Sequence, residues 1–186
     1  MNTMNERLVV GGAALLVGAL LGWVGHGLAG YSMTTDTITT SQDWRIACPS
    51  AATKDGTCEI VQDLLDGKTR GEIARFALAT DAGKRVLLIN LPLGVSLDPG
   101  VGLAFGTDPE KNIGYRTCNA QGCIAEAPLD DKLLASLNAG KDGKVLVTGL
   151  DNKRVAIPMS LKGLSDAQRI YRNNEAKRSS WFWRMW

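Results

Sequence analysis

The side chains in this sequence whose number and spacing suggest covalent or metal chemistry are its four cysteines, Cys48, Cys58, Cys118 and Cys123. Four cysteines allow three disulfide connectivities. We predict the bridges Cys48–Cys58 and Cys118–Cys123, because each closes a short loop that contains turn-forming residues. A zinc site usually has gaps of roughly two to four residues in both halves, and Cys48 and Cys58 lie further apart. Neither pair forms the C-x-x-C motif of a redox site, so structural disulfides are favoured.

Other catalytic chemistry has little support in the sequence. The single histidine, His26, lies at the end of an apolar N-terminal segment, which excludes a Ser-His-Asp triad from the remainder of the chain. The run Gly100-Val101-Gly102 lacks the third glycine and the helix start of a dinucleotide-binding motif. Neither an enzyme nor a bound cofactor or metal is predicted, and a cofactor-free enzyme is the least favoured alternative. Several carboxylates have simpler interpretations, as helix caps or as solvated strand and turn residues: Asp63, Asp66, Glu126, Asp130 and Asp131.

The composition is that of an ordinary globular domain joined to an apolar segment. The chain has 186 residues, of which 45% are hydrophobic and 22% charged, and its formal net charge is +2. That charge is too small to indicate nucleic-acid binding. We divide the chain into a membrane anchor (1–31), a polar, Thr-rich linker (32–42), a folded domain (43–168) and a basic, aromatic tail (169–186). The domain is large enough for one hydrophobic core.

The folded domain is predicted to consist mainly of β-strands. Residues 85–91 form a nearly continuous apolar run, as expected of a strand that is buried on both faces. Residues 144–148 and 154–158 are predicted to form a hairpin about Asp151-Asn152. The core candidates of this hairpin are Val145, Val147, Val155 and Ile157. Further strands are predicted at 43–47, 59–65, 72–80, 101–105, 113–117 and 124–127.

Two helices are predicted at the periphery of the domain. Asp130 is expected to cap a helix over 131–139, which ends at Gly140. A capping box, Ser165-Asp166-Ala167-Gln168, is expected to begin a second helix that continues to about Lys177. The predicted fold is therefore mainly β: a disulfide-linked β-sandwich with one or two peripheral helices, preceded by a single transmembrane helix.

The N-terminal segment has the length and composition of a membrane span. Leu8 to Leu28 is apolar, and a helix needs about 20 such residues to cross the hydrocarbon core of a bilayer. A cleaved signal peptide is the alternative, but its apolar region is shorter and its cleavage site clearer. Arg7 precedes the segment, and no Lys or Arg follows it until Arg45. That asymmetry predicts a cytoplasmic N-terminus and a domain on the other side of the membrane.

The predicted membrane helix has one face of small residues. A face of this kind lets a second helix approach closely in lipid, although glycine is also common in membrane helices generally. We predict that it packs against a transmembrane helix of another protein. Trp23 and Tyr31 are expected near the outer headgroups. The small residues of the face are Ala14, Gly18, Gly22, Gly25 and Ala29.

The C-terminal tail combines tryptophan with basic residues. Tryptophan is favoured at membrane interfaces and in protein contacts, and basic residues suit anionic headgroups. The alternative is that the tail packs onto its own domain. The predicted membrane or partner contacts in the tail are Trp181, Phe182, Trp183 and Trp186.

A set of short motifs extends from Asp43 to Ala167. They are Trp44-x-x-x-Cys48, Cys58, Leu91-Pro92-Leu93-Gly94-Val95-x-Leu97, Gly100-Val101, Tyr115-x-x-Cys118, Gly122-Cys123 and Ile157-Pro158-x-Ser160-Leu161-x-Gly163. In combination they resemble the invasion-associated locus B family of alphaproteobacterial envelope proteins. The resemblance implies an exported β-sandwich with two disulfides and no known catalytic residues. Typical members begin with a removable signal peptide, whereas an anchor is predicted here, and the basic, aromatic tail is an addition.

Two functions are compatible with these features. The first is a non-catalytic accessory subunit that stabilises a protein complex of the bacterial inner membrane, such as a respiratory or photosynthetic electron-transfer assembly. Its partners would be transmembrane helices of that complex and lipid headgroups, with no nucleic acid and no small-molecule substrate. The alternative is an envelope or host-interaction protein, as the family name suggests. In the first case the chain is a single-pass inner-membrane protein with a cytoplasmic N-terminus and a periplasmic domain.

Overall fold

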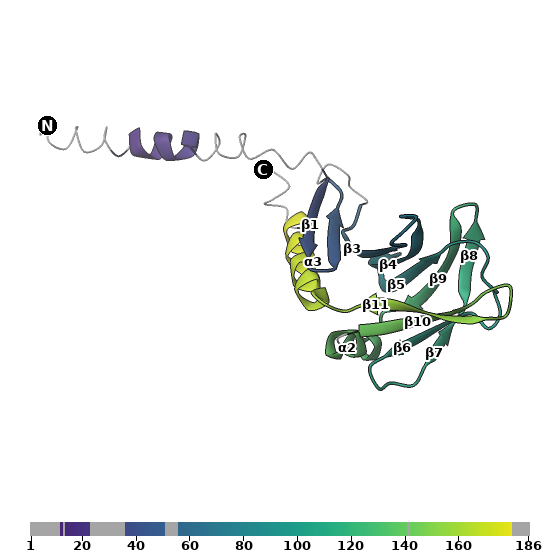
Figure 1. Ribbon diagram of the computed structural model, residues 1–186. Helices are drawn as coiled ribbons and strands as arrows, with labels where there is room; N and C mark the ends of the chain where they lie inside the picture. Colours follow the sequence, from purple (N-terminus) through teal and green to yellow (C-terminus); the bar gives the residue numbers. More distant parts are fainter. Residues whose placement is uncertain (1–11, 13, 23–35, 51–55, 141, 180–186) are drawn as a thin grey trace, which may run out of the picture.

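Two antiparallel β-sheets form most of the computed structural model (Figure 1), which describes residues 12, 14–22, 36–50, 56–140 and 142–179. The larger sheet has seven strands in the order β1-β2-β3-β4-β5-β9-β8, and the smaller has four in the order β11-β10-β6-β7. The predicted mainly β fold with two antiparallel sheets is confirmed. In the larger sheet the strands are β1 (Thr37–Ser41), β2 (Trp44–Cys48), β3 (Glu59–Leu65), β4 (Glu72–Asp81), β5 (Lys84–Leu91), β8 (Tyr115–Asn119) and β9 (Gly122–Pro128). In the smaller sheet they are β6 (Val101–Phe105), β7 (Lys111–Ile113), β10 (Asp142–Thr148) and β11 (Arg154–Ser160).

Side chains from both sheets meet in one hydrophobic core. Along β10, Gly143, Val145 and Val147 are buried and alternate with residues that are more exposed, which is the period of a strand with one face on the core. The larger sheet contributes Phe76 and Leu87, and β11 contributes Met159; all three are fully buried. Burial of a side chain of this size stabilises the fold by roughly 1.5–3 kcal/mol. The alternating burial along β10 therefore shows which face of this strand lies on the core.

Three strand predictions differ from the structure. Residues 37–41, assigned to a linker, form the edge strand β1, which pairs with β2 from Ser41↔Trp44 to Thr37↔Cys48. The predicted strand 113–117 is broken at Gly114, because the chain passes there from β7 in the smaller sheet to β8 in the larger one. Val155 is 52% exposed rather than in the core, because it lies near the turn on the edge strand β11.

The helices occupy the predicted positions, but one cap is wrong. In α2 (Asp131–Ala139), Asp130 accepts a hydrogen bond from the backbone N–H of Leu133 at 2.7 Å, as a helix cap should. The second helix, α3 (Leu164–Ser179), packs against β1, β2 and β3. Its predicted capping box does not form. The Ser165 hydroxyl and the Gln168 amide instead donate to Asn138 Oδ1 of α2, at 3.3 and 3.1 Å, and so join the two helices.

The end of β11 is held to the larger sheet by hydrogen bonds from buried side chains. The amide of Gln62 donates to the backbone carbonyl of Ser160 and accepts from its N–H, both at 3.0 Å. The indole N–H of Trp44 donates to the same carbonyl at 3.0 Å. Gly163 follows at a φ of +81°, and a Cβ there would lie 2.4 Å from the Ser41 carbonyl oxygen. Trp44, Ser160 and Gly163 of the family motifs therefore have a structural role.

Two tyrosines make a matched test of hydrogen bonding in the core. The buried hydroxyl of Tyr115 has no hydrogen-bond partner among the described residues, whereas the Tyr171 hydroxyl bonds Thr80 Oγ1 at 3.1 Å. We expect Tyr115→Phe to leave the free energy of unfolding unchanged or raise it by up to about 1 kcal/mol, because a buried polar group without a partner is destabilising. Tyr171→Phe should lower it by about 0.5–1.5 kcal/mol. Urea unfolding of both variants measures the difference.

The stability of the protein at alkaline pH gives a second test of Tyr115. Burial raises the pKa of Tyr115 above its ordinary value of 10.0. Because the folded state favours the protonated hydroxyl, Tyr115 contributes its full stabilisation below the pKa of this group in the unfolded chain. That stabilisation is lost as pH rises through the pKa in the folded protein. The stability of Tyr115→Phe should therefore fall less steeply than that of the wild type above about pH 10. Equal pH dependence in the two proteins would contradict this assignment.

Near the N-terminus, residues 14–22 are helical, and their leucine side chains are exposed. Within the described ranges, no helix combines the length and the hydropathy that crossing a bilayer requires. Most of the predicted anchor, 1–31, lies outside those ranges. The anchor therefore stays a prediction.

Candidate functional site

The four cysteines form the two predicted disulfides. Cys48–Cys58 joins the end of β2 to the residue that precedes β3, and both of its cysteines are buried. Cys118–Cys123 joins directly paired residues of the β8–β9 hairpin, and Cys118 is exposed. No cysteine is free, and the described residues contain no group of side chains that could hold a metal ion. The predicted pairing of the four cysteines is therefore confirmed.

The second half of α3 contacts the loop that the first disulfide closes. Glu175 accepts a hydrogen bond from the backbone N–H of Cys58 at 2.8 Å, and the Asn174 amide donates to Cys48 Sγ at 3.6 Å. Arg178 donates to the carbonyls of Pro49 and Gly56 on the two sides of this loop. These contacts fix the second half of α3, which includes part of the predicted tail, beside the Cys48–Cys58 bridge.

Part of the predicted helix-packing face can be seen in the structure. Ala14, Gly18 and Gly22 lie in the helix at 14–22 and are exposed, and a Cβ added to either glycine would meet no atom within 4 Å. Space for a neighbouring helix is therefore present along this stretch. The other predicted contact residues lie outside the described residues and stay predictions: Trp23, Gly25, Ala29, Tyr31, Trp181, Phe182, Trp183 and Trp186.

The carboxylates considered as catalytic candidates take part in local structure. Asp63 pairs with Arg45 and Arg75, and Glu126 pairs with Arg116 at 2.6 Å. The backbone N–H and the hydroxyl of Thr69 hold the pKa of the Asp66 carboxyl below its usual value, in the turn between β3 and β4. Asp130 caps its helix and Asp66 lies in its turn, as predicted, whereas Asp63 and Glu126 are half-buried in ion pairs rather than solvated.

Three exposed leucines gather on two loops that are hydrogen-bonded to each other. Leu93 and Leu97 are each 60% exposed, and Leu150, in the β10–β11 turn, is 75% exposed. The backbone N–H of Leu150 donates to the Gly94 carbonyl at 3.2 Å, and that of Ser96 donates to the Thr148 carbonyl at 2.7 Å. We call Leu93, Leu97 and Leu150 the leucine surface. These leucines were not predicted as a contact site, although apolar residues among turn residues such as Pro92 and Gly94 were a usable signal.

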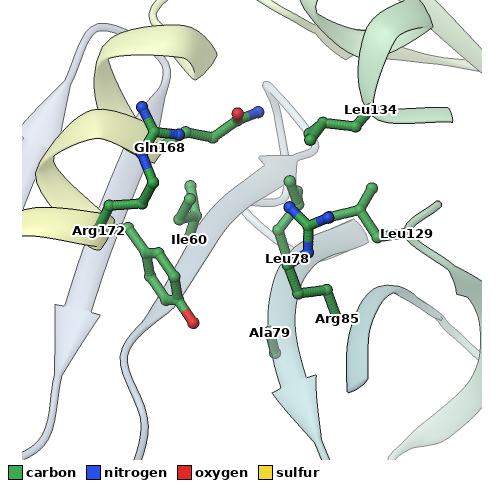
Figure 2. Close-up of a pocket in the computed structure, with 9 residues that line it drawn as sticks. Ile60, Leu78, Ala79, Arg85, Leu129, Leu134, Gln168 and Arg172 are labelled. Atoms are coloured by element: carbon green, nitrogen blue, oxygen red, sulfur yellow. The ribbon is translucent and has the colours of Figure 1, made fainter. Parts of the chain in front are cut away.

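A pocket of about 160 Å³ lies between the two helices and the larger sheet. Figure 2 shows Gln168 and Arg172 of α3 on one side, and Leu129, Leu134 and Arg85 on the other. Sequence reasoning missed this pocket, because its residues come from six segments that only the fold brings together. The remaining lining residues are Ile60, Leu78, Ala79 and Tyr171.

Comparison with known proteins confirms the resemblance seen in the motifs. The family model described as invasion associated locus B (IalB) protein matches residues 44–170. Invasion protein B homologs from two Brucella abortus strains, 2308 and biovar 1 strain 9-941, are each 33% identical over 131 residues, which is 69% of this chain and 75% of the relative. The fold is similar to the crystal structure of invasion associated protein B from Bartonella henselae, with a TM-score of 0.66 and 21% identity over 75% of this chain and 99% of that one. This chain therefore belongs to the invasion associated locus B family.

Proposed function

We propose that this chain is a non-enzymatic protein of the bacterial envelope that acts by binding another protein through the leucine surface. The observation that carries this proposal is the exposure of Leu93, Leu97 and Leu150 on loops whose backbones are hydrogen-bonded to each other. Family membership supports an envelope or invasion-associated role more than a subunit of a particular electron-transfer complex.

The loops that carry the leucine surface are joined by backbone hydrogen bonds in the free protein. Large apolar side chains gain roughly 25 cal/mol for each Å² of apolar area that a partner covers. The hydrogen bonds between the Gly94–Ser96 loop and the β10–β11 turn hold that area in place before binding, which lowers the ordering cost. Figure 1 places the β10–β11 turn at the end of the domain opposite α3. A partner bound there would leave the α3 end accessible.

The two disulfides and the predicted anchor support a location at the periplasmic face of the inner membrane. Two structural disulfides are typical of an oxidising compartment such as the periplasm. The apolar N-terminal segment would hold the domain at the periplasmic face of the inner membrane, with the N-terminus in the cytoplasm. In this arrangement the leucine surface is available to a periplasmic or outer-envelope protein.

The second candidate function is an accessory subunit of an inner-membrane complex. The exposed small-residue face of Ala14, Gly18 and Gly22 favours it, because such faces pack closely against other membrane helices. The two functions use different surfaces of the same chain. They can therefore be separated by asking which surface touches a partner in the cell.

Site-specific photo-cross-linking in intact cells tests both candidates. A photoreactive phenylalanine analogue is placed at Leu150 for the first function and at Gly18 for the second, with Lys68 in the exposed β3–β4 turn as the control position. We expect a discrete adduct from position 150 that is absent from position 68. Leu93→Ser should reduce the position-150 adduct at least about fivefold, since burying a leucine side chain against a partner contributes roughly 1.5–3 kcal/mol.

Leu93→Ser must leave the fold intact if a weaker adduct is to report the loss of a contact. Leu93 is exposed, so Leu93→Ser should change the free energy of unfolding by less than about 0.5 kcal/mol. Identical adducts from positions 150 and 68, or a position-150 adduct that persists in Leu93→Ser, would rule out the leucine surface as the contact. An adduct with an integral membrane protein from position 18 alone would favour the accessory-subunit function.

A further inference from the structure

The pocket between α3 and the larger sheet has an apolar interior. Ile60, Leu78 and Leu129 are buried members of the hydrophobic core, and Leu134 of α2 packs against them. Its volume of about 160 Å³ is close to that of an engineered protein cavity of roughly 150 Å³ that binds benzene. The space therefore suits an apolar group of about six carbon atoms.

Two arginines give the pocket a positive charge. Arg85 and Arg172 are both lining residues, and none of the lining residues is acidic. The ion pair of Arg85 is with Asp131, whose side chain is 99% exposed, at 3.4 Å. The guanidinium of Arg172 makes no hydrogen bond or ion pair with any residue in the described part of the chain. The other two arginines of α3 do, since Arg169 and Arg178 pair with Asp166 and Glu175 at 2.9 and 3.7 Å.

We propose that this pocket binds a carboxylate carried on a compact apolar group. The apolar part would occupy the space over Ile60 and Leu78, and the carboxylate would accept hydrogen bonds from the guanidinium of Arg172, while Arg85 on the opposite side of the pocket adds to its positive charge. A guanidinium presents parallel N–H donors that match the two oxygens of a carboxylate. A short fatty acid and the C-terminal residue of a peptide share this chemistry. This ligand site is separate from the leucine surface and does not depend on it.

Titration of the full chain with sodium hexanoate tests the site directly. Arginine labelled with ¹⁵N reports binding through the side-chain Nε–H resonances of Arg85 and Arg172. We expect saturable shifts with a dissociation constant on the order of 1 mM, as suits a ligand of this size. Hexanol and hexyltrimethylammonium have the same alkyl chain without the negative charge, and should bind at least about tenfold more weakly.

Variants separate the two parts of the proposed contact. Arg172→Gln should weaken hexanoate binding about tenfold, because it removes charge-assisted hydrogen bonds, and Arg85→Gln should weaken it less, because it removes only a more distant positive charge. Arg169→Gln, on the same helix but outside the pocket, is the matched control and should bind hexanoate as the wild type does. Leu134→Ala should enlarge the pocket and shift the preference from hexanoate to octanoate, an effect that a purely structural role would not produce. Thermal unfolding confirms that each variant is folded.

Two further ligands distinguish the sources of the carboxylate. A peptide terminus would be identified as the ligand if N-acetylphenylalanine binds more tightly than hexanoate and if binding is lost when its carboxylate is replaced by an amide. The reverse order would identify a free short-chain acid. Equal binding of hexanoate and hexanol, or equal affinity of Arg172→Gln and Arg169→Gln for hexanoate, would overturn the proposal.

Discussion

Replacing Trp44 with alanine is expected to lower the free energy of unfolding by about 3–5 kcal/mol, the usual range for truncation of a large buried aromatic residue. Trp44 is fully buried, and its indole N–H donates to the Ser160 carbonyl, so the substitution removes core volume and a link between the sheets. The free energy of unfolding of a domain of this size is about 5–15 kcal/mol. The substitution would therefore remove a large part of it. Urea unfolding of the full chain, followed by far-ultraviolet circular dichroism, measures the change.

Trp44→Phe is the control that separates the two contributions. Phenylalanine keeps most of the buried ring, and the Ser160 carbonyl still accepts a hydrogen bond from the Gln62 amide at 3.0 Å. We therefore expect this variant to lose only about 1–2 kcal/mol, the contribution of one hydrogen bond and a smaller side chain. Equal destabilisation by phenylalanine and alanine would show that packing of the ring is not what stabilises the two sheets.

Local pattern in the sequence was enough to predict most of the strands. Val145 and Val147 were predicted as core residues and are buried in β10, and the apolar run at 85–91 corresponds to β5 (Lys84–Leu91). The cysteine pairing could also be predicted, because each pair lies close in the chain and encloses turn residues. Asp130 and Gly140 marked the two ends of α2, since caps act within a few residues of the helix.

Features that depend on distant contacts could not be predicted in this way. Ser165 and Gln168 have the spacing of a capping box, yet both side chains donate to Asn138 of α2. The sequence around Ser165 does not predict that contact. Likewise, a glutamine in a strand gives no sign that its amide will pair with the backbone of Ser160, 98 residues later. Sequence pattern at 113–117 also could not show that Gly114 is the crossing point between two sheets.

The candidate sites differ in how far the sequence could reveal them. The leucine surface lies within one family motif and one hairpin turn, so an excess of apolar residues among turn residues was a usable signal. The arginine-lined pocket had no such signal, because Arg85 and Arg172 are far apart in the chain and arginine is common on protein surfaces. The two sites lie on different parts of the domain. Binding at one therefore need not block binding at the other.

Changing both Cys48 and Cys58 to serine is expected to lower the free energy of unfolding by about 3–4 kcal/mol, more than the roughly 2 kcal/mol expected for the pair Cys118→Ser/Cys123→Ser. The first bridge closes a longer loop, with a sequence separation of 10 against 5, and so restricts the unfolded chain more. Both of its cysteines are buried, and it fixes the loop backbone that Glu175 and Arg178 of α3 contact. Its loss should therefore raise the rate of amide hydrogen exchange in the second half of α3, whereas loss of the hairpin bridge should not. Equal destabilisation by the two double variants, with α3 equally protected in both, would show that the contacts between α3 and the loop add nothing to the stability that the bridge provides.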